Sequence, residues 1–253
     1  VASVFKNPYL ILMAKVLITR PEPDASALAE ILRGKSYSPL LEPLLTIAPV
    51  EAGALCLQDV QAVLLTSTNG LRAFASLTTE RYIWLFTVGE KTAEEAKKLG
   101  FCNVMSAGGS SASLIELTEK FLDPCAGRVL HISGDVVRQD MVGPLKQKRF
   151  QIERVIVYQT RQRIGFNPET IEGFKNNAIG SVLLYSPRTA RIFIDLLKYH
   201  RLISFCDKVQ VFCLSAEVAR EVRSCQWKKT FVASAPVQAD LLKLLNENHR
   251  QCA

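Results

Sequence analysis

The strongest constraint in this sequence is an ungapped match between two twelve-residue stretches that lie far apart. VLLTSTNGLRAF at Val63–Phe74 matches VLLYSPRTARIF at Val182–Phe193, with Ser67 opposite Ser186. An apolar run that ends at a serine and continues with helical periodicity predicts a strand, an N-cap and a helix. The chain therefore contains two copies of one strand–helix unit.

Three further pairs of segments extend this repeat. They are TVGEKTAEEA (Thr87–Ala96) with QVFCLSAEVA (Gln210–Ala219), SAGGSSASLIEL (Ser106–Leu117) with ASAPVQADLLKL (Ala233–Leu244), and KVLITRPEPD (Lys15–Asp24) with RVLHISGDVV (Arg128–Val137). The second match of the series pairs Thr92 with Ser215. The repeat is circularly offset, because the N-terminal unit resembles the middle of the chain. We expect this unit to complete the C-terminal lobe.

Alternation of strand and helix predicts parallel sheets with helices on both faces. The expected fold is α/β, with two similar doubly wound lobes joined by a two-stranded crossing and a cleft between them. Asp24 is expected to cap a helix over Ala25–Arg33, and the turn after Ser133 is expected to lead into a helix that runs to about Lys148.

Two extended segments predict where the chain crosses between the lobes. Glu153–Arg163 has the β-branched richness of a strand, and Leu40–Ile47 resembles it when Glu42 is aligned with Glu153. We expect residues 1–42 and 163–253 to form lobe 1, residues 48–152 to form lobe 2, and residues 43–47 and 153–162 to cross. Residues 1–12 are interpreted as an extension before a start at Met13.

Composition narrows the class of protein. The chain of 253 residues is 48% hydrophobic and carries a net charge of +7, which favours anionic partners. No apolar run reaches the ~18–20 residues that a membrane span needs. Seven cysteines without a CxxC pair indicate reduced thiols in a cytoplasmic protein, and three widely separated histidines predict no metal site.

Known catalytic motifs are absent from the sequence, which contains no GxSxG, P-loop, GxGxxG or HExxH. His131 lies inside a predicted strand and is interpreted as a core residue. In doubly wound sheets, ligands bind at the turns that follow the carboxyl ends of the strands. Here these turns are rich in hydroxyls and lead into helix N-termini, which favours anions such as carboxylates, although capping alone also explains any single hydroxyl.

The order and spacing of several motifs resemble the uroporphyrinogen-III synthase family from Met13 to the C-terminus. The motifs are VLITRP, LLTSTNGLRAF, TVGEKTAEEAKKLG, Gly134–Arg138, VYQT at Val157–Thr160, LLYSPRTA and SAEVA. The resemblance implies a cofactor-free reaction in heme biosynthesis. In it, hydroxymethylbilane, a linear tetrapyrrole with eight carboxylates, loses water and closes with its last ring inverted.

The resemblance also implies a role for Tyr158 as donor to the leaving hydroxyl. A tyrosine in water, with a pKa near ~10, is protonated at neutral pH. The residues expected to bind substrate are those of the strand-to-helix turns: Thr19, Arg20, Ser67, Asn69, Lys91, Thr92, Ser133, Gly134, Arg138, Ser186, Arg188 and Ser215. The chain departs from the family where Cys213 and Leu214 replace a turn glycine and Val237 replaces a threonine, which puts contacts of the C-terminal lobe in doubt.

Two other classes of function stay open at this point. A non-enzymatic two-lobed binding protein for a small anion fits the same repeat. Nucleic-acid binding fits the charge alone, but it lacks a basic stripe with interleaved aromatics. We expect a monomer with a small-molecule substrate and neither a nucleic-acid nor a membrane partner.

Overall fold

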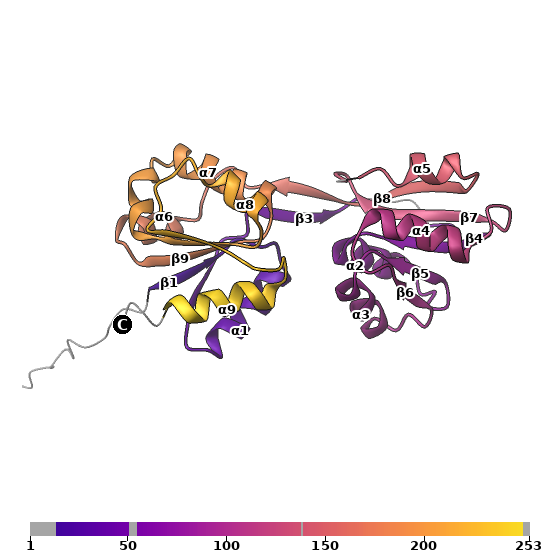
Figure 1. Ribbon diagram of the computed structural model, residues 1–253, viewed down its shortest axis with the longest axis horizontal. Coiled ribbons are helices and arrows are strands. Elements are labelled where there is room, and N and C mark those ends of the chain that lie inside the picture. Colours follow the sequence, from indigo (N-terminus) through magenta and orange to yellow (C-terminus); the bar gives the residue numbers. More distant parts are fainter. Residues whose placement is uncertain (1–13, 51–54, 138, 250–253) are drawn as a thin grey trace, which may run out of the picture. The chain divides into compact units, whose positions relative to one another are not determined.

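The structure is a computed structural model that describes residues 14–50, 55–137 and 139–249. The expected extension before Met13 and the candidate residue Arg138 lie outside these ranges. The chain divides into two compact units (Figure 1). Unit 1 contains the described residues up to Thr46 and those from Gln162 onward, and unit 2 is Ile47–Arg161.

Unit 1 is a five-stranded sheet with the order β11-β10-β9-β1-β2. Neighbouring strands in this sheet run parallel to one another. Its strands are β1 (Lys15–Ile18), β2 (Ser38–Leu41), β9 (Ile179–Leu184), β10 (Gln210–Cys213) and β11 (Lys229–Val232). Its helices are α1 (Asp24–Arg33), α6 (Pro168–Lys175), α7 (Pro187–Tyr199), the 3-10 helix η1 (Ile203–Lys208), α8 (Ala216–Glu221) and α9 (Gln238–His249).

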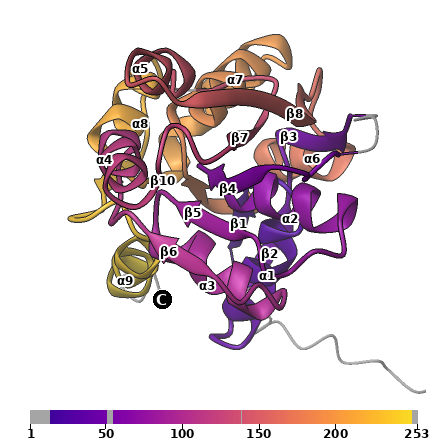
Figure 2. The ribbon, with the colours of Figure 1, turned by 90° about the vertical axis from the view of Figure 1, so that its right-hand side faces the viewer.

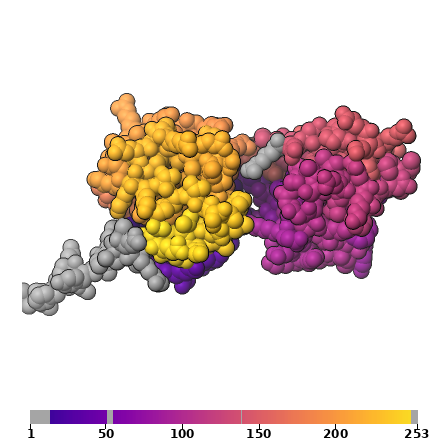
Figure 3. All heavy atoms as spheres, viewed as in Figure 1, coloured from indigo at the N-terminus to yellow at the C-terminus, as the bar shows by residue number. Residues whose placement is uncertain are grey.

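The helices of unit 1 cover both faces of its sheet. Helices α6, α7 and α8 lie on one side, and α1 and α9 lie on the other (Figure 1). Two apolar clusters fill these layers, one centred on Phe193 and the other on Phe212. In the space-filling view of Figure 3, the C-terminal part of the chain, which includes α9, covers much of the visible face of unit 1.

Unit 2 carries a sheet with the order β3-β8-β7-β4-β5-β6. Its strands are β3 (Leu45–Pro49), β4 (Val60–Leu65), β5 (Trp84–Thr87), β6 (Val104–Ser106), β7 (Arg128–Gly134) and β8 (Gln151–Gln162). Its helices are α2 (Thr68–Leu77), α3 (Glu90–Lys98), α4 (Ser111–Phe121) and α5 (Val142–Gln147). Figure 2 shows α2 and α3 on one side of this sheet and α4 and α5 on the other.

The two sheets show the predicted circular repeat. Reading unit 2 from its β6 edge gives β6-β5-β4-β7-β8, which corresponds in order to β11-β10-β9-β1-β2 of unit 1. Strand register supports the longest sequence match, because Val63 pairs with Leu130 in unit 2 while Val182 pairs with Leu17 in unit 1. The N-terminal strand and the strand at Arg128 are therefore equivalent, as their sequences predict.

Register corrects two of the sequence alignments. Val63 pairs with Leu85 and Val182 pairs with Val211, so the strand register places Gly89, not Thr92, opposite Ser215. The helix starts agree, because Gly89 and Ser215 occupy the N-cap positions of α3 and α8. The alignment of Glu42 with Glu153 is likewise wrong by two residues, since the pairings of Leu17 with Leu40 and of Leu130 with Glu153 make Leu40 the equivalent of Glu153.

Three expected elements differ from the structure. The extended segment Leu40–Ile47 is broken into β2 and β3, because Leu44 is buried and Glu42 bends inward to accept from the Asn167 N–H. Asp24 is the first residue of α1 and not its cap, since its carboxylate pairs with Arg20. The helix after β7 begins only at Val142, because side-chain hydrogen bonds hold the start of the preceding loop against β8.

Candidate active site

The centre of the candidate site is Tyr158, which a β-bulge turns toward helix α2. Ser133 pairs with Ile156, but Gly134 pairs with Tyr158, so β8 holds one extra residue, Val157, at this point. Without the bulge, side chains would alternate and Tyr158 would face away from Val157. Instead both residues pack in the cluster that contains α2, and the Tyr158 side chain is 9% exposed.

The Tyr158 ring lies directly against Gly134. A Cβ atom added at Gly134 would stand 2.5 Å from Cε2 and 2.6 Å from Cζ of Tyr158. No side chain fits at that separation, so the ring can lie here only over a glycine. The Gly134 requirement arises from this close approach and not from an unusual backbone angle, because its φ lies outside the left-handed region.

Ser67 joins the tyrosine to the start of α2. Its Oγ accepts from the Gly70 N–H at 3.1 Å, which caps the helix, and lies 3.2 Å from the Tyr158 hydroxyl. That second contact is longer than an optimal O–H···O bond of ~2.7–2.8 Å. The contact between the two hydroxyls is therefore weaker than an optimal hydrogen bond.

The remaining candidate residues of unit 2 fall into two groups. Ser133 is buried and fully engaged, since its hydroxyl accepts from Arg154 Nε at 2.8 Å and donates to the Gly134 carbonyl. Thr92 is also buried, in the first turn of α3. Asn69 is half-buried in the first turn of α2, and Lys91 is exposed in the first turn of α3. Only the second group presents side chains to solvent at the carboxyl edge of the sheet.

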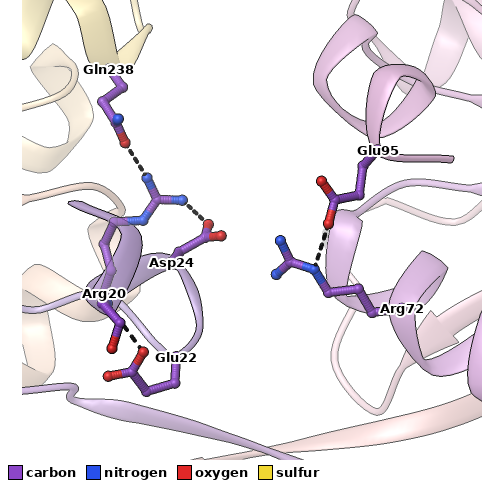
Figure 4. Close-up of polar contacts among 7 residues, drawn as sticks. Arg20, Glu22, Asp24, Arg72, Glu95 and Gln238 are labelled. Atoms are coloured by element: carbon purple, nitrogen blue, oxygen red, sulfur yellow. Dashed lines mark hydrogen bonds and ion pairs between the residues drawn. The ribbon is translucent and has the colours of Figure 1, made fainter. Parts of the chain in front are cut away.

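In unit 1, Arg20 is engaged by its own unit. Its guanidinium pairs with Asp24 and donates to Gln238 Oε1 at 2.7 Å (Figure 4). It also lies 4.5 Å from the centre of the Tyr185 ring. Burial raises the pKa of Tyr185 to about 12 against the opposing effect of Arg20, and its hydroxyl has no partner among the described residues. The charge of Arg20 is thus neutralised by Asp24 within unit 1.

Arg188 offers a different arrangement in the same unit. It lies in the first turn of α7, half-buried, and no hydrogen bond or ion pair engages its guanidinium within the described residues. The neighbouring Ser186 caps α7 by accepting from the Thr189 N–H at 3.1 Å. The Thr19 hydroxyl donates to the Leu183 carbonyl, and that of Ser215 binds Glu217 and thereby lowers the pKa of that carboxyl. Unlike that of Arg20, the guanidinium of Arg188 therefore has no partner within the described residues.

The buried titratable groups away from this edge, namely His131, Cys206 and Cys213, are core residues. His131 is 1% exposed, both of its ring nitrogens lack partners among the described residues, and burial together with Arg154 lowers its pKa to about 4. This confirms the interpretation of His131 as a core residue. Cys206 and Cys213 are buried, and burial raises the pKa of each thiol to about 12, whereas Cys56 is exposed.

Sequence reasoning missed Arg154 and Asp135, which hold the turn after β7. Arg154 Nη2 donates to the carbonyls of Gly134 at 2.6 Å and Asp135 at 2.8 Å, and Asp135 Oδ1 accepts from the Thr160 N–H at 3.0 Å. The available signal was the position of Arg154 four residues before the candidate tyrosine. Such a signal has little specificity, because exposed basic residues are frequent in this chain.

A second charged contact lies in the helices of unit 2. Arg72 of α2 donates through Nε to Glu95 Oε1 of α3 at 3.0 Å (Figure 4). Within the described ranges, no group of three His, Cys, Asp or Glu side chains is arranged to hold a metal ion. The same ranges contain no helix both long and apolar enough to cross a membrane.

The fold and its circular repeat define a protein of two α/β units, each with polar strand-to-helix turns at the carboxyl edge of a parallel sheet. A family model described as uroporphyrinogen-III synthase HemD matches residues 26–243. The chain therefore belongs to the uroporphyrinogen-III synthase family. Its function is that of the cyclising synthase of heme biosynthesis.

Solved structures show the same fold. The uroporphyrinogen-III synthetase from Helicobacter pylori is similar with a TM-score of 0.62 and 15% identity, covering 93% of this chain and 99% of that one. A mutant uroporphyrinogen III synthase from the extremely thermophilic bacterium Thermus thermophilus gives a TM-score of 0.53 and 15% identity, covering 95% and 100%. No curated protein matches the chain by sequence.

Proposed function

We propose that Tyr158 is the proton donor in the closure of hydroxymethylbilane to uroporphyrinogen III. The observation that carries this proposal is the geometry of Tyr158: a β-bulge turns its ring over Gly134 and brings its hydroxyl to the cap of α2. Gly134 and the bulge fix the position of its ring, while its hydroxyl makes only the 3.2 Å contact with Ser67 Oγ among the described residues. A tyrosine hydroxyl suits a leaving group that needs only hydrogen bonding to depart.

The step balances without another reactant. As the C–O bond of the hydroxymethyl group breaks, the departing oxygen takes the tyrosine proton and leaves as water, while the pyrrole nitrogens spread the positive charge. The last ring then attacks this carbon through its substituted α-carbon and forms a spiro intermediate. The bond from that α-carbon to its original methylene breaks, and the free α-carbon of the ring forms a new bond to the same methylene, which leaves the ring inverted. The proton that is lost when this ring regains its aromatic form replaces the one that was donated. The remaining task of the protein is to hold a flexible substrate in the geometry that inverts the last ring, because closure without inversion needs no enzyme.

Carboxylate recognition is proposed for the strand-to-helix turns. Asn69 and Lys91 in unit 2 and Arg188 in unit 1 present polar or cationic side chains there, next to the helix N-termini of α2, α3 and α7. A net charge of +7 favours capture of a substrate with eight carboxylates. Thr19, Ser133 and Arg20 are proposed to shape the turns, because their polar groups are already engaged.

We also propose that the enzyme acts as a monomer in the cytoplasm. The six cysteines of the described ranges are all free thiols, which suits a reducing compartment. Sedimentation of the purified protein and fractionation of cells test the two parts of this proposal separately.

The decisive experiment follows the isomer that forms. Freshly prepared hydroxymethylbilane is incubated with the protein, and the oxidised type I and type III porphyrins are separated. We expect type III with the natural chain, and type I in its absence. Production of only type I would overturn the assignment and return the binding-protein alternative. The same assay on Tyr158→Phe tests the proton donor.

A further inference from the structure

We propose that Arg154 and Asp135 are positioning residues for Tyr158, an inference that rests on the proton-donor role given above. Together with the main chain of residues 133–135 and the Thr160 N–H, they form a set of contacts that we call the latch. The latch joins the turn after β7 to strand β8 on both sides of the tyrosine.

The first half of the latch is Arg154, four residues before Tyr158 on β8. Its guanidinium donates to Ser133 Oγ at 2.8 Å, to the Gly134 carbonyl at 2.6 Å and to the Asp135 carbonyl at 2.8 Å. A planar guanidinium holds its acceptors in one orientation because its donors are fixed in a plane, whereas the three donors of an ammonium group rotate about its stem. Arg154 therefore fixes the peptide of Gly134, on which the tyrosine ring lies.

The second half is Asp135, whose carboxylate contacts β8 two residues beyond Tyr158. Asp135 Oδ1 accepts from the Thr160 N–H at 3.0 Å and from the Val136 N–H at 2.9 Å, and the Asp135 N–H donates to the Tyr158 carbonyl at 3.0 Å. These bonds continue the pairing of β7 and β8 past the bulge, where regular pairing ends. They fix the backbone of Tyr158 at the point where the extra residue would otherwise let it rotate.

The consequence is a defined distance between the tyrosine hydroxyl and Ser67. The ring is confined from below by Gly134, and its backbone is held by the latch. If the latch loosens, the bulge gains freedom and the hydroxyl leaves its position at the cap of α2. Misplacement of a reacting group by about 1 Å can lower a rate on the order of 10²-fold.

The test is a double-mutant cycle between the latch and the tyrosine. Asp135→Ala alone is expected to lower kcat for type III formation roughly tenfold or more, with KM unchanged, because the carboxylate of Asp135 is assigned to the latch and not to the substrate. Added to Tyr158→Phe, it is expected to cause no further loss, because the hydroxyl that it positions is already gone. Asp135→Asn, which keeps the accepting oxygen, is expected to restore most of the rate.

Glu153→Gln is the matched control, since Glu153 lies next to Arg154 on β8. Within the described part of the chain, its side chain makes only an exposed ion pair with Arg128 at 3.4 Å. It is expected to leave kcat unchanged. If Asp135→Ala does not fold, Arg154→Lys replaces it in the cycle, because it keeps the charge and loses the fixed set of three donors.

The outcomes separate this inference from the proposed function. Equal losses from Asp135→Ala in the natural and Tyr158→Phe backgrounds would overturn the positioning role and leave the proton donor intact. Full activity of Tyr158→Phe alone would show that Tyr158 is not the proton donor. The latch would then have no catalytic group to position. If Asp135→Ala lowers kcat in the natural chain but not in the Tyr158→Phe background, both the proton-donor role and the positioning role are supported.

Discussion

The Tyr158 hydroxyl lies 3.2 Å from Ser67 Oγ, although the two residues are 91 positions apart in the sequence. Ser67 follows strand β4 and caps α2, and Tyr158 reaches it from β8, with β7 between the two strands. The bulge in β8 makes this contact possible, because it turns two successive side chains to the same face. The chemistry proposed for this edge depends on that local irregularity.

Removal of the tyrosine hydroxyl is expected to reduce catalysis more than removal of any hydroxyl beside it. Tyr158→Phe keeps the ring over Gly134, so the variant should fold normally and form type III porphyrinogen more slowly. A lost hydrogen bond to developing charge often costs ~10²-fold; we expect a smaller loss because this leaving group departs readily. Ser67→Ala, Thr92→Ala and Ser186→Ala should each act chiefly on KM. Full activity of Tyr158→Phe with an inactive Thr92→Ala would move the donor to the α3 turn.

Gly134→Ala is expected to displace the Tyr158 ring and lower kcat at least as much as Tyr158→Phe. The new Cβ would lie 2.5 Å from the ring, so either the ring or the strand must move. Gly89→Ala is the matched control, because it is a glycine at an equivalent strand-to-helix turn with no atom within 4 Å of an added Cβ. Steady-state kinetics and circular dichroism check both variants. Equal activity of the two would show that the ring position is unimportant.

Arg188 and Arg20 are expected to respond differently to loss of charge. Arg188→Gln should raise KM and weaken the dependence of kcat/KM on salt, because its guanidinium is available to a carboxylate. Arg20→Gln should chiefly lower thermal stability, because it removes the ion pair with Asp24 and the contact with the Tyr185 ring. A KM effect confined to Arg20→Gln would reverse the two assignments.

His131 is expected to make unit 2 less stable as the pH falls. Its pKa is about 4 in the folded chain, compared with 6.5 for an imidazole that is not buried. Below about pH 6.5 the unfolded chain therefore binds a proton at His131 that the folded chain does not bind. Burial is the main cause, Arg154 adds to it, and Asp140 opposes it. Stability is therefore lost as the pH falls from about 6.5 towards 4. His131→Leu should remove this loss, which amounts to about 2 kcal/mol between pH 7 and 5.

Urea unfolding of the natural chain and of His131→Leu at both pH values measures this effect. The variant also removes two ring nitrogens that have no partner among the described residues, so a gain in stability at neutral pH is expected as well. Only the additional gain at pH 5 reports the proton. A gain of the same size at both pH values would contradict the low pKa.

Much of the fold can be predicted from sequence because apolar runs and capping serines repeat with the same spacing. Val63 and Val182 occupy equivalent strand positions, and Ser67 and Ser186 cap equivalent helices. The match of Thr92 with Ser215 fails because the similar helix sequence begins at the helix start in α8 but three residues after it in α3. Sequence similarity there reflects the helices alone, and the cap of α3 is the glycine three residues earlier.

The site is less predictable than the fold because its geometry depends on tertiary contacts. Tyr158 could be selected from its sequence context, but the bulge at Val157 that aims it leaves no pattern in the apolar residues around it. Arg20 has the right charge and position to bind an anion, yet Asp24 one helical turn away neutralises it. Such a pairing is visible in the sequence only once the start of α1 is known.

The circular repeat also has a consequence for how the chain is made. Unit 2 is one continuous segment, whereas β1 of unit 1 has a neighbour, β9, that is synthesised after all of unit 2. During translation, unit 2 can therefore complete its sheet while β1, α1 and β2 still lack the strand that closes their own. We expect a released, truncated chain that ends near residue 175 to protect unit 2 from protease and to leave the N-terminal strand exposed. The N-terminal residues therefore become part of a folded unit only after β9, near residue 180, has been synthesised.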